Sequence, residues 1–345
     1  MGPVYSNDSK WIGCKNSLHA KAQLFYFRRV FKLNKTKASI CIRVSADSRY
    51  KLYVNDKLVS TGPCKGNIHT WYYETVDVTD CLVQGINVIA AEVLHFAERT
   101  VNFSSRRGIR SVERTSLAAF LLDGVLLDRQ SSILEDLSTD EKWKVKQEEG
   151  IVFLENRETL YVSAFEHVDF KYMPLDWRSA SFDDSLWDGA LIITESMVGK
   201  NCSNDWGGLA PWMLEESPIP QLTRIRRSYD GITKCSLNRH GLEDLITGVK
   251  AARFPPETCS FFEMDPGEYM TGYFNLSFKG GMGSVIKIQY SECYESYQDG
   301  VYIKGKRDNS EGVLRGDVYT YQLSTRISKT GFEIRPKVLK VMFEP

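Results

Sequence analysis

An adjacent pair of acidic residues, Asp183-Asp184, is the first candidate for chemistry in this sequence, because glycoside hydrolysis uses two carboxyl groups. Inverting glycosidases hold these groups roughly 6.5–9.5 Å apart, on either side of the bond that is cleaved. Neighbouring side chains of an extended segment point in opposite directions, so this pair cannot readily flank one bond. We expect instead a turn that places Trp187 in a core. A calcium site that uses the pair stays open, although its other ligands are not evident.

Histidine and serine patterns give no further catalytic candidate. The histidines stand at positions 19, 69, 95, 167 and 240, without the HExxH spacing of a zinc site. No Gly-x-Ser-x-Gly sequence, which would present a serine nucleophile on a sharp turn, occurs. We therefore predict no catalytic residue, no metal ligand and no cofactor for this chain.

Length and charge limit the classes of partner. The chain has 345 residues, enough for two or three domains, and its 44 basic residues balance 44 acidic ones. A balanced charge gives no long-range attraction to nucleic acid or to an anionic membrane, so neither is an expected partner. The amino terminus lacks an export signal, and no stretch reaches the roughly 18 apolar residues of a membrane span. We predict a cytoplasmic protein of unspecified oligomeric state, in which the eight cysteines are reduced.

Short alternating segments between residues 43 and 93 predict that β-strands organise the chain. In Tyr50–Val54 the side chains alternate as in a half-buried strand, and Asn55-Asp56 is a typical hairpin turn. Strands joined by turns rather than by helices indicate a β-sandwich. In an earlier strand Arg28-Arg29 is expected to face solvent, and Asp123-Gly124 is expected to form another hairpin turn.

The pattern of strands predicts a mainly β fold with two β-sandwich domains. We place a β-sandwich at residues 1–190, an irregular connector at 191–257 and a second β-sandwich at 258–345. A short helix is expected within the connector at 242–252.

Two ordered motifs carry a resemblance to a known family. Residues 50–93 contain YxLYVNxxxVxxGP followed by WYYExxDVTxxLxxGxNxIAxxV, and residues 272–292 read GYxxLxxxGGxGxxIxIxYxE. The first motif resembles the amino-terminal jelly-roll sandwich of the α-L-rhamnosidases of glycoside hydrolase family 78. The second is similar to their concanavalin-like domain, and the two occur in the expected order. The last strand that the resemblance implies appears only vaguely near 337–341, so the second sandwich is expected to be incomplete.

The resemblance implies a function in carbohydrate recognition without catalysis. In that family the catalytic acid and base belong to a helical (α/α)6 barrel after the second sandwich, and nothing after Thr258 resembles a stack of amphipathic helices. We expect a noncatalytic carbohydrate-recognition or scaffold region of an α-L-rhamnosidase-like glycoside hydrolase. The alternatives are a truncated α-L-rhamnosidase whose barrel is missing and a protein-interaction sandwich without sugar binding.

The densest group of side chains suited to a sugar lies in and before the second half of the first motif. Aromatic faces pack on the C–H surfaces of sugars, and carboxylates bond their hydroxyl groups. The predicted carbohydrate-binding residues are Asp47, Trp71, Tyr73 and Glu74, with a rhamnose-containing glycan as the ligand. Trp71 and Tyr73 share one face of a regular strand. The alternative is that these aromatic rings fill a core or a domain interface.

Overall fold

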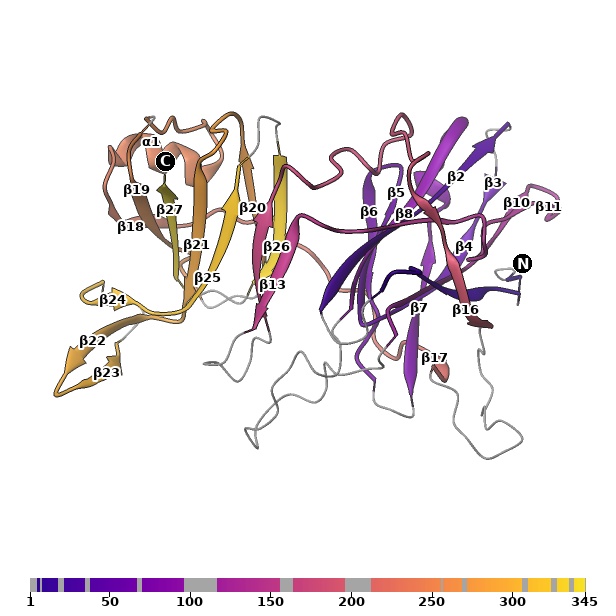
Figure 1. Cartoon of the computed structure of the whole chain (residues 1–345), viewed down its shortest axis with the longest axis horizontal. Coiled ribbons are helices and arrows are strands. Elements are labelled where there is room, and N and C mark those ends of the chain that lie inside the picture. Colours follow the sequence, from indigo (N-terminus) through magenta and orange to yellow (C-terminus); the bar gives the residue numbers. More distant parts are fainter. Residues whose placement is uncertain are drawn as a thin grey trace. The chain divides into compact units, whose positions relative to one another are not determined.

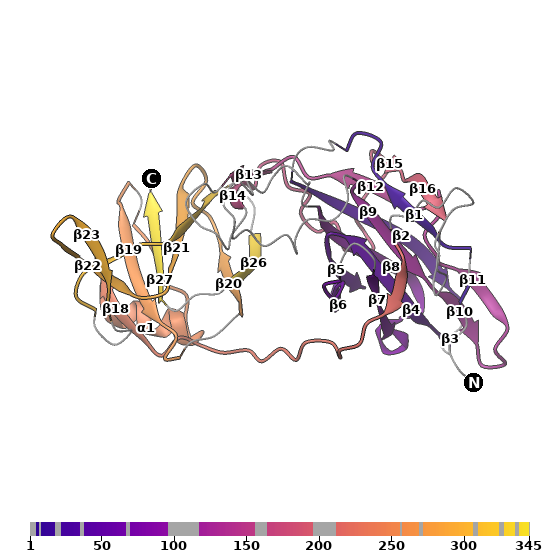
Figure 2. The same ribbon diagram turned by 90° about the horizontal axis from the view of Figure 1, so that it is seen from below.

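The protein consists mainly of β-strands, which form two compact units (Figures 1 and 2). The first unit comprises Met1–Glu148, Glu155–Ala164 and Pro174–Thr223, and the second comprises Glu149–Leu154, Phe165–Met173 and Arg224–Pro345. The computed structural model describes residues 5–6, 8–17, 22–34, 38–66, 70–95, 117–155, 164–195, 212–255, 257–268, 272–305, 310–323, 328–334 and 338–344.

Two six-stranded sheets form the first unit, with a small third sheet beside them. One has the order β16-β1-β9-β4-β7-β17, the other β15-β12-β2-β8-β5-β6, and the three-stranded sheet has the order β11-β10-β3. The bounds of the first sheet are β1 (Lys10–Gly13), β4 (Cys41–Asp47), β7 (Trp71–Asp77), β9 (Ala119–Asp123), β16 (Leu191–Glu195) and β17 (Leu214–Glu216). Those of the second are β2 (Gln23–Leu33), β5 (Arg49–Val54), β6 (Lys57–Gly62), β8 (Gly85–His95), β12 (Lys144–Gln147) and β15 (Asp188–Gly189). The third consists of β3 (Ala38–Ser39), β10 (Val125–Asp128) and β11 (Ile133–Asp136).

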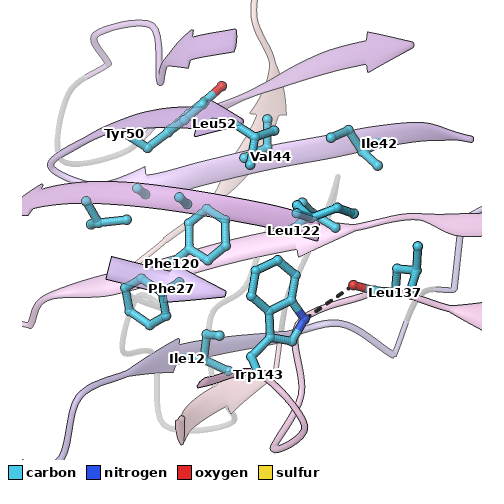
Figure 3. Close-up of a cluster of buried hydrophobic side chains, with 14 of the residues drawn as sticks. Ile12, Phe27, Ile42, Val44, Tyr50, Leu52, Phe120, Leu122, Leu137 and Trp143 are labelled. Carbon is cyan, nitrogen blue, oxygen red and sulfur yellow. Dashed lines mark hydrogen bonds between the residues drawn. The ribbon is translucent and has the colours of Figure 1, made fainter. Parts of the chain in front are cut away.

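The main core of the first unit contains side chains of both six-stranded sheets (Figure 3). Val44 and Phe120 belong to one sheet and Phe27 and Leu52 to the other, and all four side chains are fully buried. The indole N–H of Trp143 closes this core by donating to a main-chain carbonyl 3.3 Å away (Figure 3). Each such apolar side chain stabilises the fold by about 1.5–3 kcal/mol.

The hairpin between β5 and β6 confirms the turn predicted at Asn55-Asp56. Both residues have left-handed backbone angles, with φ of 49° and 66°, as a two-residue turn with the twist of a β-hairpin requires. The Asn55 amide donates to the Asn87 side chain at 2.8 Å, and the Asn55 side-chain oxygen accepts from the Val88 N–H at 3.0 Å. The turn is therefore tied to the neighbouring strand β8.

Two local expectations for the first unit are wrong. Arg28, expected to face solvent, is 1% exposed, because its guanidinium reaches main-chain carbonyls of the segment from Trp177 to Phe182. Asp123-Gly124 does not join a hairpin, because β9 and β10 belong to different sheets. A Cβ atom on Gly124 would lie 2.5 Å from the Ile42 side chain, so the close approach of two strands explains the glycine better than a turn does.

The second unit is built on a seven-stranded sheet with the order β13-β14-β25-β21-β27-β19-β18. Its strands are β13 (Ile151–Glu155), β14 (Ala164–Asp169), β18 (Gly231–Cys235), β19 (Ser260–Asp265), β21 (Val285–Ser291), β25 (Asp317–Gln322) and β27 (Val338–Glu344). The pair β20 (Gly272–Phe278) and β26 (Ser328–Ile334) forms a second layer, from which Phe274, Leu276 and Phe278 pack against the core. A three-stranded sheet consists of β22 (Tyr294–Gln298), β23 (Val301–Lys304) and β24 (Val313–Leu314).

Regular elements are present in the last strand and in residues 191–257. β27 pairs with both β19 and β21, so the strand expected to be imperfect lies inside the sheet. Residues 191–257, expected to be an irregular connector with a short helix, contain β16, β17, β18 and the helix α1 (Arg239–Thr247). Asn238 caps this helix by accepting the His240 N–H, and Gly248 ends it with φ of 76°. In the described part of the chain no helix is long and apolar enough to cross a membrane.

Candidate functional site

The structure places all four predicted sugar-binding residues inside the first unit. Asp47, Trp71, Tyr73 and Glu74 are 0%, 4%, 9% and 6% exposed. Trp71 and Tyr73 enter the same side-chain cluster, which confirms that they share a face of β7. Glu74 stands opposite the core residue Val44 and therefore faces the other way. Asp47, Trp71 and Tyr73 thus lie on one side of the sheet, which we call the outer face, and Glu74 on the core side.

The carboxylate of Asp47, at the end of β4, is an internal hydrogen-bond acceptor. The indole N–H of Trp212 donates to one oxygen at 3.1 Å, and the hydroxyl of Ser48 donates to the other at 3.2 Å. Nδ1 of His95 lies 3.4 Å from the same oxygen as the Ser48 hydroxyl, and its ring is 1% exposed. These groups all belong to the chain itself, so the carboxylate joins the end of β4 to the segment before β17 and lies next to His95 of β8.

An aromatic cluster fills the outer face beside Asp47. Trp212 stacks on Trp11 with ring centroids 4.4 Å apart and an angle of 24° between the planes. The other buried members of this cluster are Trp71, Tyr73, Ala119, Leu121 and Leu214. β17 pairs in parallel with β7, which sets Leu214 beside Trp71. These aromatic rings therefore lie in a hydrophobic core, as the alternative interpretation of the sequence expects.

A sugar could reach the aromatic faces only if residues 212–216 moved away. The side chain of Trp212 is 2% exposed and covers Asp47 and Trp11. Ring stacking of this kind adds about 0.5–1.5 kcal/mol to the free energy of burying the rings. The geometry of the outer face thus provides packing and hydrogen bonds that replace the contacts a sugar would make.

Glu74 has a separate role on the core side of β7. Its carboxylate accepts the Cys64 N–H at 2.8 Å. A Cβ atom on Gly62 would lie 2.9 Å from the Tyr50 ring and 3.1 Å from the Glu74 side chain, so the three residues are in close contact. Burial raises the pKa of Tyr50 well above its usual value, and the negative charge of Glu74 adds to that rise. Glu74 thus holds the segment that follows β6 in place through its hydrogen bond to the main chain of Cys64.

A buried ion pair that the sequence analysis did not identify also lies beneath the outer face. Arg43 on β4 is paired with Asp123 on β9. Its guanidinium carbon lies 3.7 Å from the ring centre of Tyr5 and 5.7 Å from that of Tyr73. Burial raises the pKa of Tyr73, and the negative charge of Glu216 adds to that rise. A charged residue between apolar neighbours in a strand was the signal for this pair.

The acidic pair Asp183-Asp184 stabilises a turn and a buried arginine. Asp183 accepts the Ser185 N–H at 3.0 Å, and this hydrogen bond lowers the pKa of its carboxyl group. Asp184 lies 3.0 Å from the guanidinium of the buried Arg28. Trp187 is buried and packs on Phe182, with the centroids of the two rings 5.6 Å apart. The expected turn is confirmed, and the two carboxylates are held by different partners.

No group of three or more histidine, cysteine, aspartate or glutamate side chains is arranged to hold a metal ion among the residues that the structure describes. His19 and His69 lie outside these residues.

Comparison with known families finds a similarity for the segment that contains the candidate site. Residues 35–202 match the family model described as the α-L-rhamnosidase N-terminal domain. The matched segment is therefore similar to an α-L-rhamnosidase N-terminal domain. It contains all four predicted site residues but not Trp11 or Trp212, which close the outer face. A comparison with curated proteins gives no match.

Solved α-L-rhamnosidases share the fold of the whole chain. The enzyme from Dictyoglumus thermophilum matches with a TM-score of 0.61 and 15% identity, over 98% of this chain and 34% of that one. The enzyme from Aspergillus terreus has a TM-score of 0.61 and 16% identity, over 97% and 34%. The family 78 rhamnosidase of Bacillus sp. GL1 has a TM-score of 0.51 and 19% identity, over 97% and 33%.

The chain thus spans about a third of the length of these enzymes. Identities of 15–19% show the fold alone. The expected resemblance to the amino-terminal part of an α-L-rhamnosidase is confirmed.

Proposed function

We propose that this chain is a noncatalytic scaffold region of an α-L-rhamnosidase-like glycoside hydrolase. One observation carries the proposal: Trp212 covers the outer face and bonds Asp47, so that the residues best suited to a sugar are used in packing. The acidic pair Asp183-Asp184 supports the noncatalytic part, because a main-chain N–H and Arg28 hold its two carboxylates.

Carbohydrate recognition at the outer face is the second candidate function. It is favoured by the arrangement of Asp47, Trp71 and Tyr73 on one face, where Trp212 covers Asp47 and precedes an edge strand, β17, of only three residues. Displacement of Trp212 together with that strand would uncover two aromatic rings and a carboxylate, which suit a rhamnose-containing glycan. A binding energy of roughly −4 kcal/mol, or a Kd near 1 mM, is expected of such a site.

Titration of the chain with L-rhamnose, galactose and rhamnogalacturonan oligosaccharides distinguishes the two functions. Tryptophan fluorescence follows binding, since Trp11, Trp71 and Trp212 all lie at the outer face. A scaffold gives no saturable change with any of the sugars. Binding that becomes tighter in Trp212→Ala would instead support recognition beneath β17.

An assay with p-nitrophenyl α-L-rhamnoside tests the noncatalytic part of the proposal. The expected rate equals that of a buffer blank at all pH values between 4 and 8. Hydrolysis that copurifies with the chain and is lost in Asp184→Asn would contradict the proposal, because that residue is assigned to Arg28.

A further inference from the structure

The hairpin of β22 and β23, which we call the arm, projects from the seven-stranded sheet of the second unit (Figure 1). Asp299 and Gly300 join its strands, with φ of 48° and 83°. These left-handed angles are those of a two-residue turn that matches the twist of a hairpin. β24 pairs with the other side of β22, so the sheet order is β23-β22-β24.

The arm exposes apolar side chains on both of its faces. Tyr297 and Tyr302 form a cross-strand pair with ring centroids 4.9 Å apart, and they are 65% and 45% exposed. Val301 and Ile303, which alternate with Tyr302 and so lie on the opposite face, are 58% and 44% exposed. A two-stranded hairpin is too thin to bury both faces by itself. Contiguous exposed apolar surface of this kind marks an interaction site.

The outer edge of β23 is open in the described part of the chain, where β22 is its single neighbour. A two-residue turn closes on a hydrogen-bonded pair, here Gln298 and Val301. The next pair along the hairpin, Tyr297 and Tyr302, is then a non-hydrogen-bonded pair. The main-chain N–H and C=O groups of Tyr302 therefore point away from β22, toward the open edge. Such an edge is a template for pairing with another strand.

We propose that the arm binds the arm of a second copy of this chain, with the two β23 strands antiparallel about a twofold axis at Tyr302. In this register Tyr302 faces Tyr302 of the second copy, and the two residues exchange main-chain hydrogen bonds. Val301 of each copy faces Ile303 of the other, which covers apolar side chains on the opposite face. Lys304 faces Gly300, so no like charges meet.

Charge and symmetry favour a second copy over other occupants. The guanidinium of Arg315 lies 3.8 Å from the centre of the Tyr302 ring and 3.4 Å from the Glu295 carboxylate. Lys304 lies 2.7 Å from the Glu292 carboxylate. Among the described residues, the two cations beside these tyrosines, Arg315 and Lys304, are thus each paired with a carboxylate, which suits a surface that meets itself. A glycan stacked on the tyrosines would leave the edge of β23 and the aliphatic face uncovered.

Sedimentation equilibrium of the full chain from about 5 to 500 µM tests the proposal. A small interface of this type predicts a reversible dimer with a Kd on the order of 10–100 µM. Ile303→Lys, which places a charge at the open edge while leaving the pairing with β22 in place, is expected to raise the Kd at least tenfold. Val313→Lys, on the opposite edge of the same sheet, is the matched control and is expected to change the Kd less than twofold.

Disulfide formation tests the register. Cross-strand Cα atoms in a hydrogen-bonded pair lie about 5.5 Å apart, within the range that a disulfide spans. In a Cys259→Ser background, which removes an exposed thiol, Tyr302→Cys should form a covalent dimer under mild oxidation at least tenfold faster than Val313→Cys.

Three results would overturn the proposal. They are a monomer at every concentration, a dimer that Ile303→Lys leaves unchanged, and equal cross-linking at positions 302 and 313. Saturable binding of an oligosaccharide that quenches tyrosine fluorescence, without self-association, would assign the arm to a glycan instead. The circular dichroism spectrum of each variant confirms that it is folded.

Discussion

Truncation of Trp212 perturbs the outer face at the residue that closes it. The side chain is 2% exposed, stacks on Trp11 and donates its N–H to Asp47. Replacement of a buried tryptophan by alanine costs about 3–5 kcal/mol through lost burial and the cavity that remains. A hydrogen bond to a charged group contributes about 1.5–3 kcal/mol of stability. We therefore expect Trp212→Ala to lower the free energy of unfolding by about 4–5 kcal/mol, and Trp212→Phe, which keeps a ring but loses the N–H, by about 2 kcal/mol.

Urea unfolding, followed by tryptophan fluorescence and far-ultraviolet circular dichroism, measures both variants. Because the chain has two compact units, the data are fitted to two transitions, and only the transition of the first unit should shift. An unchanged slope with urea concentration shows that stability rather than the denatured state has changed. Losses below about 1 kcal/mol for Trp212→Ala, with Trp212→Phe equal to wild type, would refute the packing of the outer face as described.

Three further predictions concern the first unit. Asp184→Asn should lower the free energy of unfolding by about 1–3 kcal/mol, because the buried Arg28 loses its carboxylate. Asp183→Asn should lower it by about 0.5 kcal/mol or less in the same urea assay, since asparagine still accepts the turn hydrogen bond. Equal losses would contradict the assignment. Asn55→Ala should lower the free energy of unfolding by about 2–4 kcal/mol, because alanine disfavours the left-handed backbone angle and loses the side-chain hydrogen bonds. Asn55→Gly should lower it less, because glycine adopts that angle and loses only the hydrogen bonds. Thermal unfolding of the two variants tests this order. Burial raises the pKa of Tyr53 to about 12, with the charge of Glu92 adding to the rise, so this side chain ionises first in the unfolded chain and its contribution to stability falls by about 2–3 kcal/mol between pH 10 and 12. Other buried tyrosines of the first unit, such as Tyr50, add to the loss. The loss over this pH range should therefore be about 2–3 kcal/mol smaller in Tyr53→Phe than in the wild type, and equal losses would place the cause elsewhere.

Local features of the fold could be predicted from the sequence because neighbouring residues determine them. The left-handed turn at Asn55-Asp56 follows from residues that tolerate positive φ, and the turn before Trp187 follows from an aspartate that accepts a nearby N–H. Strand alternation likewise placed Trp71 and Tyr73 on one face.

Contacts between distant segments were beyond the reach of the sequence patterns. Arg28 is buried because carbonyls about 150 positions later in the chain receive its guanidinium, and no pattern within β2 contains that information. The outer face holds suitable residues for a sugar, and only the position of Trp212, 165 positions after Asp47, shows what covers them. Composition thus indicated the residues of the candidate site without indicating their partners.

Isothermal titration of the wild-type chain with L-rhamnose and a rhamnogalacturonan oligosaccharide, at millimolar sugar, tests the central claim most directly. The account predicts no saturable heat, because the aromatic rings and the carboxylate on the outer face are engaged by Trp11 and Trp212. Saturable binding that is abolished in a folded Tyr73→Leu variant would contradict it and show that the outer face opens to receive a sugar.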